Sequence, residues 1–244
     1  IDLMEPQRAT KEELADGEYR APSAMADNSD DAVIELSHAI DPSFAEAGKS
    51  LPEGEAPIPA RLQYEAAHLL RQLVHEHIVD KHLGTAYATA SETARTKSGD
   101  CTEHAVLLAA VLKARGIPAR VCHGLVYVEQ GGSAISGRAA DAAGGGGAAA
   151  PDVDADTVYG QYGWHMWTQA MVQGHWIDLD ATLHVHYSVG HVLVGTSSMS
   201  DREAHNNHMQ MAALIGNLNI DVNQVSHEWP SQQGESKEES KEEL

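Results

Sequence analysis

The chain has 244 residues, of which 42% are apolar and only 5% aromatic, and its formal net charge is −20. This apolar content is enough for a folded core and excludes a wholly disordered chain. The strong negative charge excludes general electrostatic binding to nucleic acid or to an anionic membrane. The longest uncharged apolar run, near residues 105–112, is too short to span a bilayer, so no transmembrane helix is expected.

The start of the chain and its cysteine content bear on where the protein works. The first residue is Ile1 rather than methionine, and no signal-peptide pattern follows, so we expect a processed piece of a longer protein. Two cysteines, Cys101 and Cys122, are too few for a disulfide framework, and the compartment is therefore not assigned. An exported or extracytoplasmic domain of a larger protein is compatible with these features.

Three segments are poorly suited to a packed core. Residues 1–30 carry eight acidic and three basic side chains, which predicts a loosely held acidic arm. Residues 131–157 predict a flexible insertion, because fifteen of the first twenty are Gly or Ala. Residues 227–244 end in a repeated Ser, Lys and Glu pattern that predicts a disordered acidic tail. The remaining residues, 31–226 with the insertion, are predicted to form one domain.

Within this domain the predicted helices precede the predicted strands. Residues 58–80 place Leu and Ala at helical spacing, and residues 101–115 are apolar nearly all round, as in a buried helix that ends before Gly116. Strands rich in Val, Tyr, Trp and Ile are predicted over 119–128, 164–172, 175–180 and 183–194, followed by a helix near 200–214 and a strand near 217–225. Helices followed by a mostly antiparallel sheet predict an α+β fold.

The buried helix begins with a candidate nucleophile, Cys101. Asp100 suits the N-cap position, and Glu103 completes a variant of the capping box. Free N–H groups and the helix dipole stabilise a thiolate in the first turn, although the two adjacent acids oppose this effect. Cys101 therefore needs a basic partner to act as a nucleophile, and without one it is a small buried thiol like most free cysteines.

A basic partner is predicted in the hairpin around Gln173-Gly174. If these two residues form the whole turn, the register places His165 and Asp180 on one face as diagonal neighbours, about 7–8 Å apart at Cα. Their side chains are long enough to close this gap to a hydrogen bond. Asp178 shares the face but lies one pleat further away, so Asp180 is the better candidate to orient His165.

Three motifs occur in a fixed order through this region. They are Gly99-Asp100-Cys101, followed by Arg115-Gly116-Ile117-Pro118-Ala119-Arg120-Val121; Trp164-His165-Met166-Trp167; and Trp176-Ile177-Asp178-Leu179-Asp180-Ala181-Thr182. Together they resemble the core of the transglutaminase-like superfamily, in the form of a bacterial transglutaminase-core domain. The last motif resembles the family's Asp-Pro-Thr segment, with Ala181 in place of proline. The resemblance covers residues 60–185, and more loosely 30–225.

The resemblance implies a papain-like fold in which a buried nucleophile helix packs on a mostly antiparallel sheet. Carried over to the matching positions, it implies Cys101 as nucleophile, His165 as general base and acid, and Asp180 as the group that orients His165. The implied activity is hydrolysis of an amide in a protein or peptide, through a thioester acyl-enzyme and with neither cofactor nor metal. The Cys101 backbone N–H would be one oxyanion donor, and a second is expected from a side chain upstream of Cys101.

Other histidines offer weaker alternatives. His104 lies on nearly the same helix face as the nucleophile, but no carboxylate is placed to orient it, which favours a structural role. The pairs His75 with His77 and His184 with His186 are the closest candidates for metal ligands. No third ligand has a spacing that recurs in known sites, and no His-Glu-x-x-His pattern occurs, which favours surface imidazoles.

Two other functions are open to a domain of this kind. Acyl transfer to an amine would use the same thioester as hydrolysis. A non-catalytic interaction module is the second alternative, since transglutaminase-like folds can lose the triad. Cys101, His165 and Asp180 are all present here, which favours an enzyme.

Overall fold

The computed structural model describes residues 6–49, 57–81, 88–130, 159–183 and 190–202. The predicted insertion at 131–157, the strand near 217–225 and the tail at 227–244 lie outside these ranges, as does the helix near 200–214 apart from its first three residues. No helix within the described ranges is long and apolar enough to cross a membrane.

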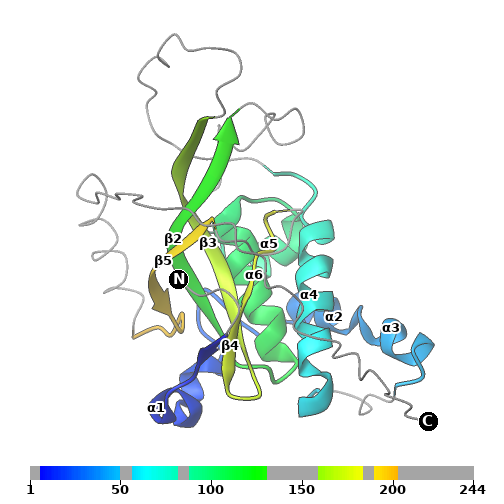
Figure 1. The fold of residues 1–244 in the computed structure, drawn as a ribbon. Helices are drawn as coiled ribbons and strands as arrows, with labels where there is room; N and C mark the ends of the chain where they lie inside the picture. Colours follow the sequence, from blue (N-terminus) through cyan, green and yellow to red (C-terminus); the bar gives the residue numbers. More distant parts are fainter. Residues whose placement is uncertain (1–5, 50–56, 82–87, 131–158, 184–189, 203–244) are drawn as a thin grey trace, which may run out of the picture.

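Helix α6 (Cys101–Ala114) lies at the centre of the hydrophobic core, as its sequence predicts. Its N-terminus is capped reciprocally, because the Thr102 N–H donates to the Asp100 carboxylate and the Asp100 N–H donates to Glu103. Residues 105–112 are almost wholly buried on all sides of the helix. This burial arises because α6 is covered by the sheet on one side and by other helices on the other (Figure 1).

The first two of the remaining helices lie beside an edge of the sheet, and the others pack around α6 or extend from that layer (Figure 1). They are α1 (Lys11–Ala15), η1 (Gly17–Tyr19), α2 (Asp31–His38), α3 (Asp41–Glu46), η2 (Ala60–Leu62), α4 (Gln63–His77) and α5 (Ala90–Thr96). Helix α4 and the turn η2 lie within the predicted helix 58–80, which is confirmed with shorter bounds. The pattern did not predict α2 or α5, although each has a side-chain N-cap, Asp30 and Thr89 respectively.

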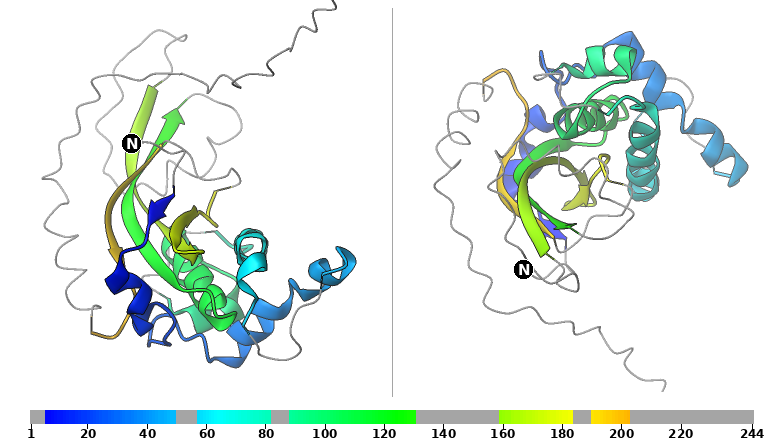
Figure 2. Two further views of the ribbon diagram at one scale, coloured as in Figure 1. Left: turned by 60° about the horizontal axis from the view of Figure 1, so that its bottom comes forward. Right: turned by 90° about the horizontal axis from the view of Figure 1, so that it is seen from above.

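Within the described residues, five strands form one curved sheet in the order β1-β4-β3-β2-β5 (Figure 2). They are β1 (Gln7–Arg8), β2 (Ala119–Gln130), β3 (Tyr159–Val172), β4 (His175–Leu179) and β5 (His191–Ser197). All four pairings between these strands are antiparallel, which confirms the α+β class and the nucleophile helix packed on an antiparallel sheet. Of the strand predicted over 183–194, residues 184–189 lie outside the described ranges, and β5 covers its last four residues and continues to Ser197.

The N-terminal segment is part of this fold. Gln7 and Arg8 pair with β4 at the sheet edge, and Ala26 is fully buried in the main core. The buried guanidinium of Arg120 donates to Glu13 at 2.5 Å. The prediction of a loosely held arm is therefore wrong for residues 6–30. The acidic composition of the segment favours an arm, but Glu13 is the partner of a buried cation, Arg120.

The hairpin between β3 and β4 has the predicted register. Val172 pairs with His175 across Gln173-Gly174, and the ladder continues to Thr168 opposite Leu179. Gln173 adopts a left-handed backbone conformation, with φ of 51°, as a two-residue turn between twisted strands requires. This register brings the end of β4 alongside the part of β3 that carries His165.

Gly124 in β2 allows β5 and a tryptophan of β3 to approach closely. A Cβ atom at Gly124 would lie 2.1 Å from the Val192 carbonyl oxygen and 2.7 Å from the Trp167 indole.

We expect Gly124→Ala to lower the free energy of unfolding by about 2–3 kcal/mol, since the clash involves the backbone. Urea denaturation measures this change. Gly195→Ala, where nothing lies within 4 Å of the added carbon, is the control and should stay within about 0.5 kcal/mol. Equal effects of the two substitutions would contradict the close approach.

Candidate active site

Cys101 occupies the first turn of α6 and is partly buried. The chain enters this helix through Gly99, whose φ of 153° is a conformation that residues with a side chain rarely adopt. Glu103 also lies too close to Gly99 to leave room for a side chain. A Cβ atom there would lie 2.3 Å from that of Glu103. The other cysteine, Cys122, is fully buried in β2, and burial raises its pKa well above the ordinary value. Of the two thiols, Cys101 is the less buried.

His165 and Asp180 are hydrogen-bonded, as the hairpin register predicts. The Nε2–H of His165 donates to Oδ2 of Asp180 at 2.7 Å, and both side chains are buried. The other carboxylate oxygen, Oδ1, accepts from the backbone N–H of Thr182 at 2.8 Å and of Leu183 at 3.3 Å. Asp180 is thereby held at the point where the chain leaves β4.

The pKa values of this pair indicate an imidazolium beside a carboxylate. Burial alone would lower the pKa of His165, but hydrogen bonds with Asp180 and Cys101, and their charges, raise it to about 10. Burial would raise the pKa of Asp180, but two imidazoles, His165 and His191, lower it far below its ordinary value. The Cys101 thiol therefore lies beside a histidine that is charged at neutral pH.

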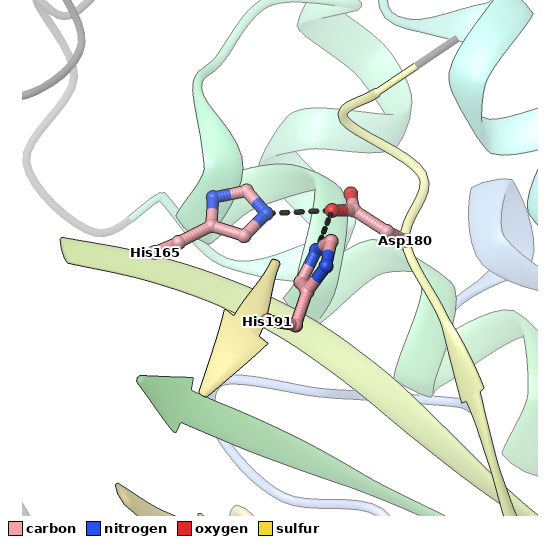
Figure 3. A group of neighbouring side chains, drawn as sticks. All are labelled: His165, Asp180 and His191. Atoms are coloured by element: carbon pink, nitrogen blue, oxygen red, sulfur yellow. Dashed lines mark hydrogen bonds and ion pairs between the residues drawn. The ribbon is translucent and has the colours of Figure 1, made fainter. Parts of the chain in front are cut away.

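His191 is a member of the site that the sequence did not reveal. Its Nε2–H donates to the same Oδ2 of Asp180 at 2.9 Å, and its side chain is fully buried. Figure 3 shows the imidazoles of His165 and His191 reaching one carboxylate oxygen from different strands. The sequence held no signal for this contact, because His191 comes from β5, at the opposite side of the sheet order from β4.

Helix α4 anchors the turn that carries Asp180. Arg71 Nε donates to the Asp180 carbonyl oxygen at 2.6 Å, and its Nη2 donates to the carbonyl of Leu183. His75 Nδ1 hydrogen-bonds to the Ala181 carbonyl oxygen at 2.8 Å. His77 bonds instead to the carbonyl of Ala94, so His75 and His77 serve two different backbone groups.

Asp178 and His104, the nearest rivals to the predicted residues, have other partners. Asp178 Oδ1 accepts from Trp167 Nε1 and from Gln169 Nε2, both at 2.8 Å. His104 Nδ1 donates to the Asp100 carbonyl oxygen at 2.6 Å, and burial lowers its pKa to about 4. His104 is thus a neutral, buried helix histidine, which agrees with the structural role expected for it.

One group within the described residues could hold a metal ion. Its ligand atoms, from His165, Asp180 and His191, all lie within 4.8 Å of one another. Ligands at 2.0–2.1 Å around a tetrahedral zinc ion lie about 3.3 Å apart. The observed separations of 2.7 and 2.9 Å from the imidazole nitrogens to Oδ2 are shorter and fit hydrogen bonds. The predicted pair His184 and His186 lies outside the described residues.

The charge state of His165 can be measured directly by NMR titration of its imidazole. We expect His165 to stay protonated well above its ordinary pKa of 6.5, and to lose its proton only near pH 10. Between pH 6.5 and about 10, the folded chain holds this proton and the unfolded chain does not. Its contribution to stability is therefore fully present below pH 6.5 and is lost as the pH rises through about 10.

The matched variant for this titration is Asp180→Asn, which removes the main group that raises the pKa of His165. Burial then dominates, and the midpoint should fall toward 6.5 or below. A midpoint near 6.5 in the unsubstituted protein would contradict the charged pair.

The fold and site define an α+β domain in which a cysteine at a helix start meets a histidine and an aspartate from an antiparallel sheet. The model of the transglutaminase-like superfamily matches residues 56–181, just over half of the chain. The chain therefore belongs to the transglutaminase-like superfamily, as its motifs predicted. Comparison with curated proteins gives no match.

Several solved structures are similar to parts of the chain. A candidate cysteine protease from Cytophaga hutchinsonii is 19% identical, with a TM-score of 0.47, over 82% of this chain and 53% of its own. The periplasmic domain of TgpA from Pseudomonas aeruginosa, bound to ethylmercury, is 23% identical with a TM-score of 0.26, over 59% of this chain and 50% of its own. A second structure of that domain is 25% identical with a TM-score of 0.25, over 59% and 48%. The chain thus spans about half the length of each of these structures.

Proposed function

We propose that this domain is a cysteine-dependent amide hydrolase that acts on a peptide or protein through a triad of Cys101, His165 and Asp180. One arrangement carries the proposal. The imidazole of His165 interacts with the Cys101 thiol and donates to Asp180 at 2.7 Å. An activated thiol nucleophile requires a thiol at a helix N-terminus, a base, and a group that orients the base.

The first half of the proposed reaction forms a thioester. The Cys101 thiolate attacks the amide carbonyl carbon, and the charge that develops on the carbonyl oxygen is stabilised by the Cys101 backbone N–H in the first turn of α6. Nε2 of His165 is occupied by Asp180, so Nδ1 carries the proton that is transferred. This proton passes to the leaving nitrogen as the carbon–nitrogen bond breaks, and a free amine departs.

The second half consumes the thioester. Neutral His165 takes a proton from water, the resulting hydroxide attacks the thioester carbon, and the carbon–sulfur bond breaks to give a carboxylic acid. The thiolate and the imidazolium are thereby restored. Asp180 stays ionised throughout, and stabilises the imidazolium whenever His165 holds both protons.

Acyl transfer to an amine is the second candidate, because an amine can replace water in the second half. A peptide library incubated with and without an added primary amine separates the two activities by mass spectrometry. We expect new amino and carboxyl termini as the main products, with amine-linked products in the minority. Predominantly amine-linked products would favour the acyl transferase. A library left unchanged by protein with an intact Cys101 thiol would favour a non-catalytic interaction module.

A further inference from the structure

We infer that His191 is a positioning residue, which holds the Asp180 carboxylate in the orientation that His165 needs. This inference rests on the proposed function, since it concerns the same site. His191 touches neither the nucleophile nor a substrate in the proposed mechanism. It acts through Asp180, to which its Nε2–H donates at 2.9 Å.

The carboxylate of Asp180 accepts from a nearly complete set of donors. Oδ1 accepts from two backbone N–H groups of the following turn, and Oδ2 accepts from His165 and His191. A carboxylate held only at Oδ1 and by His165 could still rotate about its Cβ–Cγ bond whenever the imidazole moves. The second donor on Oδ2 opposes this rotation, because it approaches from another strand.

His191 is itself fixed by its surroundings. It lies at the start of β5, paired with Val126 of β2, and its side chain has no exposed surface. The Trp167 indole packs edge-on against its ring, with centroids 5.2 Å apart. Trp167 is in turn tied to Asp178 by the hydrogen bond from its Nε1. A ring confined in this way can define the position of the oxygen to which it donates (Figure 3).

The expected consequence is a loss of turnover without a loss of substrate binding. His191→Leu removes the donor but keeps a bulky side chain, and kcat should fall by about ten- to hundredfold, the effect of a displacement of the order of 1 Å at a reacting group. KM should change less than about twofold, because the buried imidazole is closed to substrate. His191→Gln, whose amide can donate from nearly the same position as Nε2–H, should recover most of the activity.

A substrate-free readout of the same effect is the alkylation rate of Cys101 by iodoacetamide at pH 6. This rate reports the reactivity of the Cys101 thiol beside His165 and needs no knowledge of the substrate. We expect His191→Leu and Asp180→Asn each to lower it. The double variant should be no slower than Asp180→Asn alone if His191 acts through the Asp180 carboxylate and not through its ring contact with His165, with centroids 5.6 Å apart. A merely structural role would instead give two independent, additive losses.

The outcomes separate this inference from the proposed function. If His165→Gln does not slow the alkylation of Cys101, the triad itself fails. If His165→Gln slows it but His191→Leu does not, or if His191→Gln is as slow as His191→Leu, only the role of His191 is overturned. The same holds if the losses in the double variant are additive. Activity that disappears with a chelator and returns with zinc would also overturn it, since the three side chains would then be metal ligands.

Discussion

Replacing Cys101 with serine is expected to lower kcat by about 10⁴-fold or more, with a melting curve close to that of the unsubstituted protein. Serine keeps the size of the side chain, but its hydroxyl is far less acidic than a thiol and forms no stable ion pair with the His165 imidazolium. Losses of this size are general for the nucleophile of a triad, because the remaining members cannot act without it. Stability should change little, because Cys101 is only partly buried at the first turn of α6.

The matched control is the second cysteine. Cys122→Ala removes a fully buried thiol from β2 and should lower stability by about 1 kcal/mol while leaving kcat near the original value. Mass mapping after limiting alkylation should find the label on Cys101. A Cys101→Ser protein that retains its turnover, or a label found mainly on Cys122, would show that the reactive thiol has been wrongly assigned.

Asp180→Asn is expected to lower kcat by about 10³- to 10⁴-fold while the protein remains folded. Asparagine can keep its Oδ1 as acceptor for the N–H groups of Thr182 and Leu183. Its amide nitrogen then replaces Oδ2 and meets two Nε2–H donors, so His165 must change its tautomer or move. Loss of the orienting carboxylate lowers kcat by this much in other triads in which a carboxylate orients the histidine.

Asp178→Asn is the control for Asp180→Asn, because it makes the same chemical change two residues earlier in the chain. Asp178 accepts from Trp167 and Gln169, both of which an asparagine oxygen can still satisfy. Its effect on kcat should be tenfold or less, through changes in the local field only. Steady-state kinetics of both variants, with thermal melts alongside, make the comparison. The reverse order of effects would identify Asp178 as the orienting group, and two mild effects would mean that His165 is held by something else.

Much of the fold follows from local sequence signals. The all-round apolar pattern of residues 101–115 predicts a helix enclosed on every side, and α6 has this environment. The hairpin could be placed residue by residue because a two-residue turn determines the register of both strands. The contact between His165 and Asp180 could be predicted because both residues belong to that one hairpin.

Features that depend on contacts between distant segments could not be predicted in this way. The strand β1 and the ion pair of Glu13 with Arg120 join residues more than a hundred positions apart, and the local composition of residues 1–30 carries no sign of them. His191 is hidden for the same reason. It belongs to β5, which β3 and β2 separate from β4 in the sheet order, and a period-two pattern does not encode which strands become neighbours.

The alkylation of Cys101 at pH 6 tests the central claim, a Cys101 nucleophile activated by His165, most directly. Iodoacetamide should label Cys101 rapidly in the unsubstituted protein, and His165→Gln should slow this reaction by about tenfold or more. A rate of Cys101 labelling that His165→Gln leaves unchanged would contradict the account.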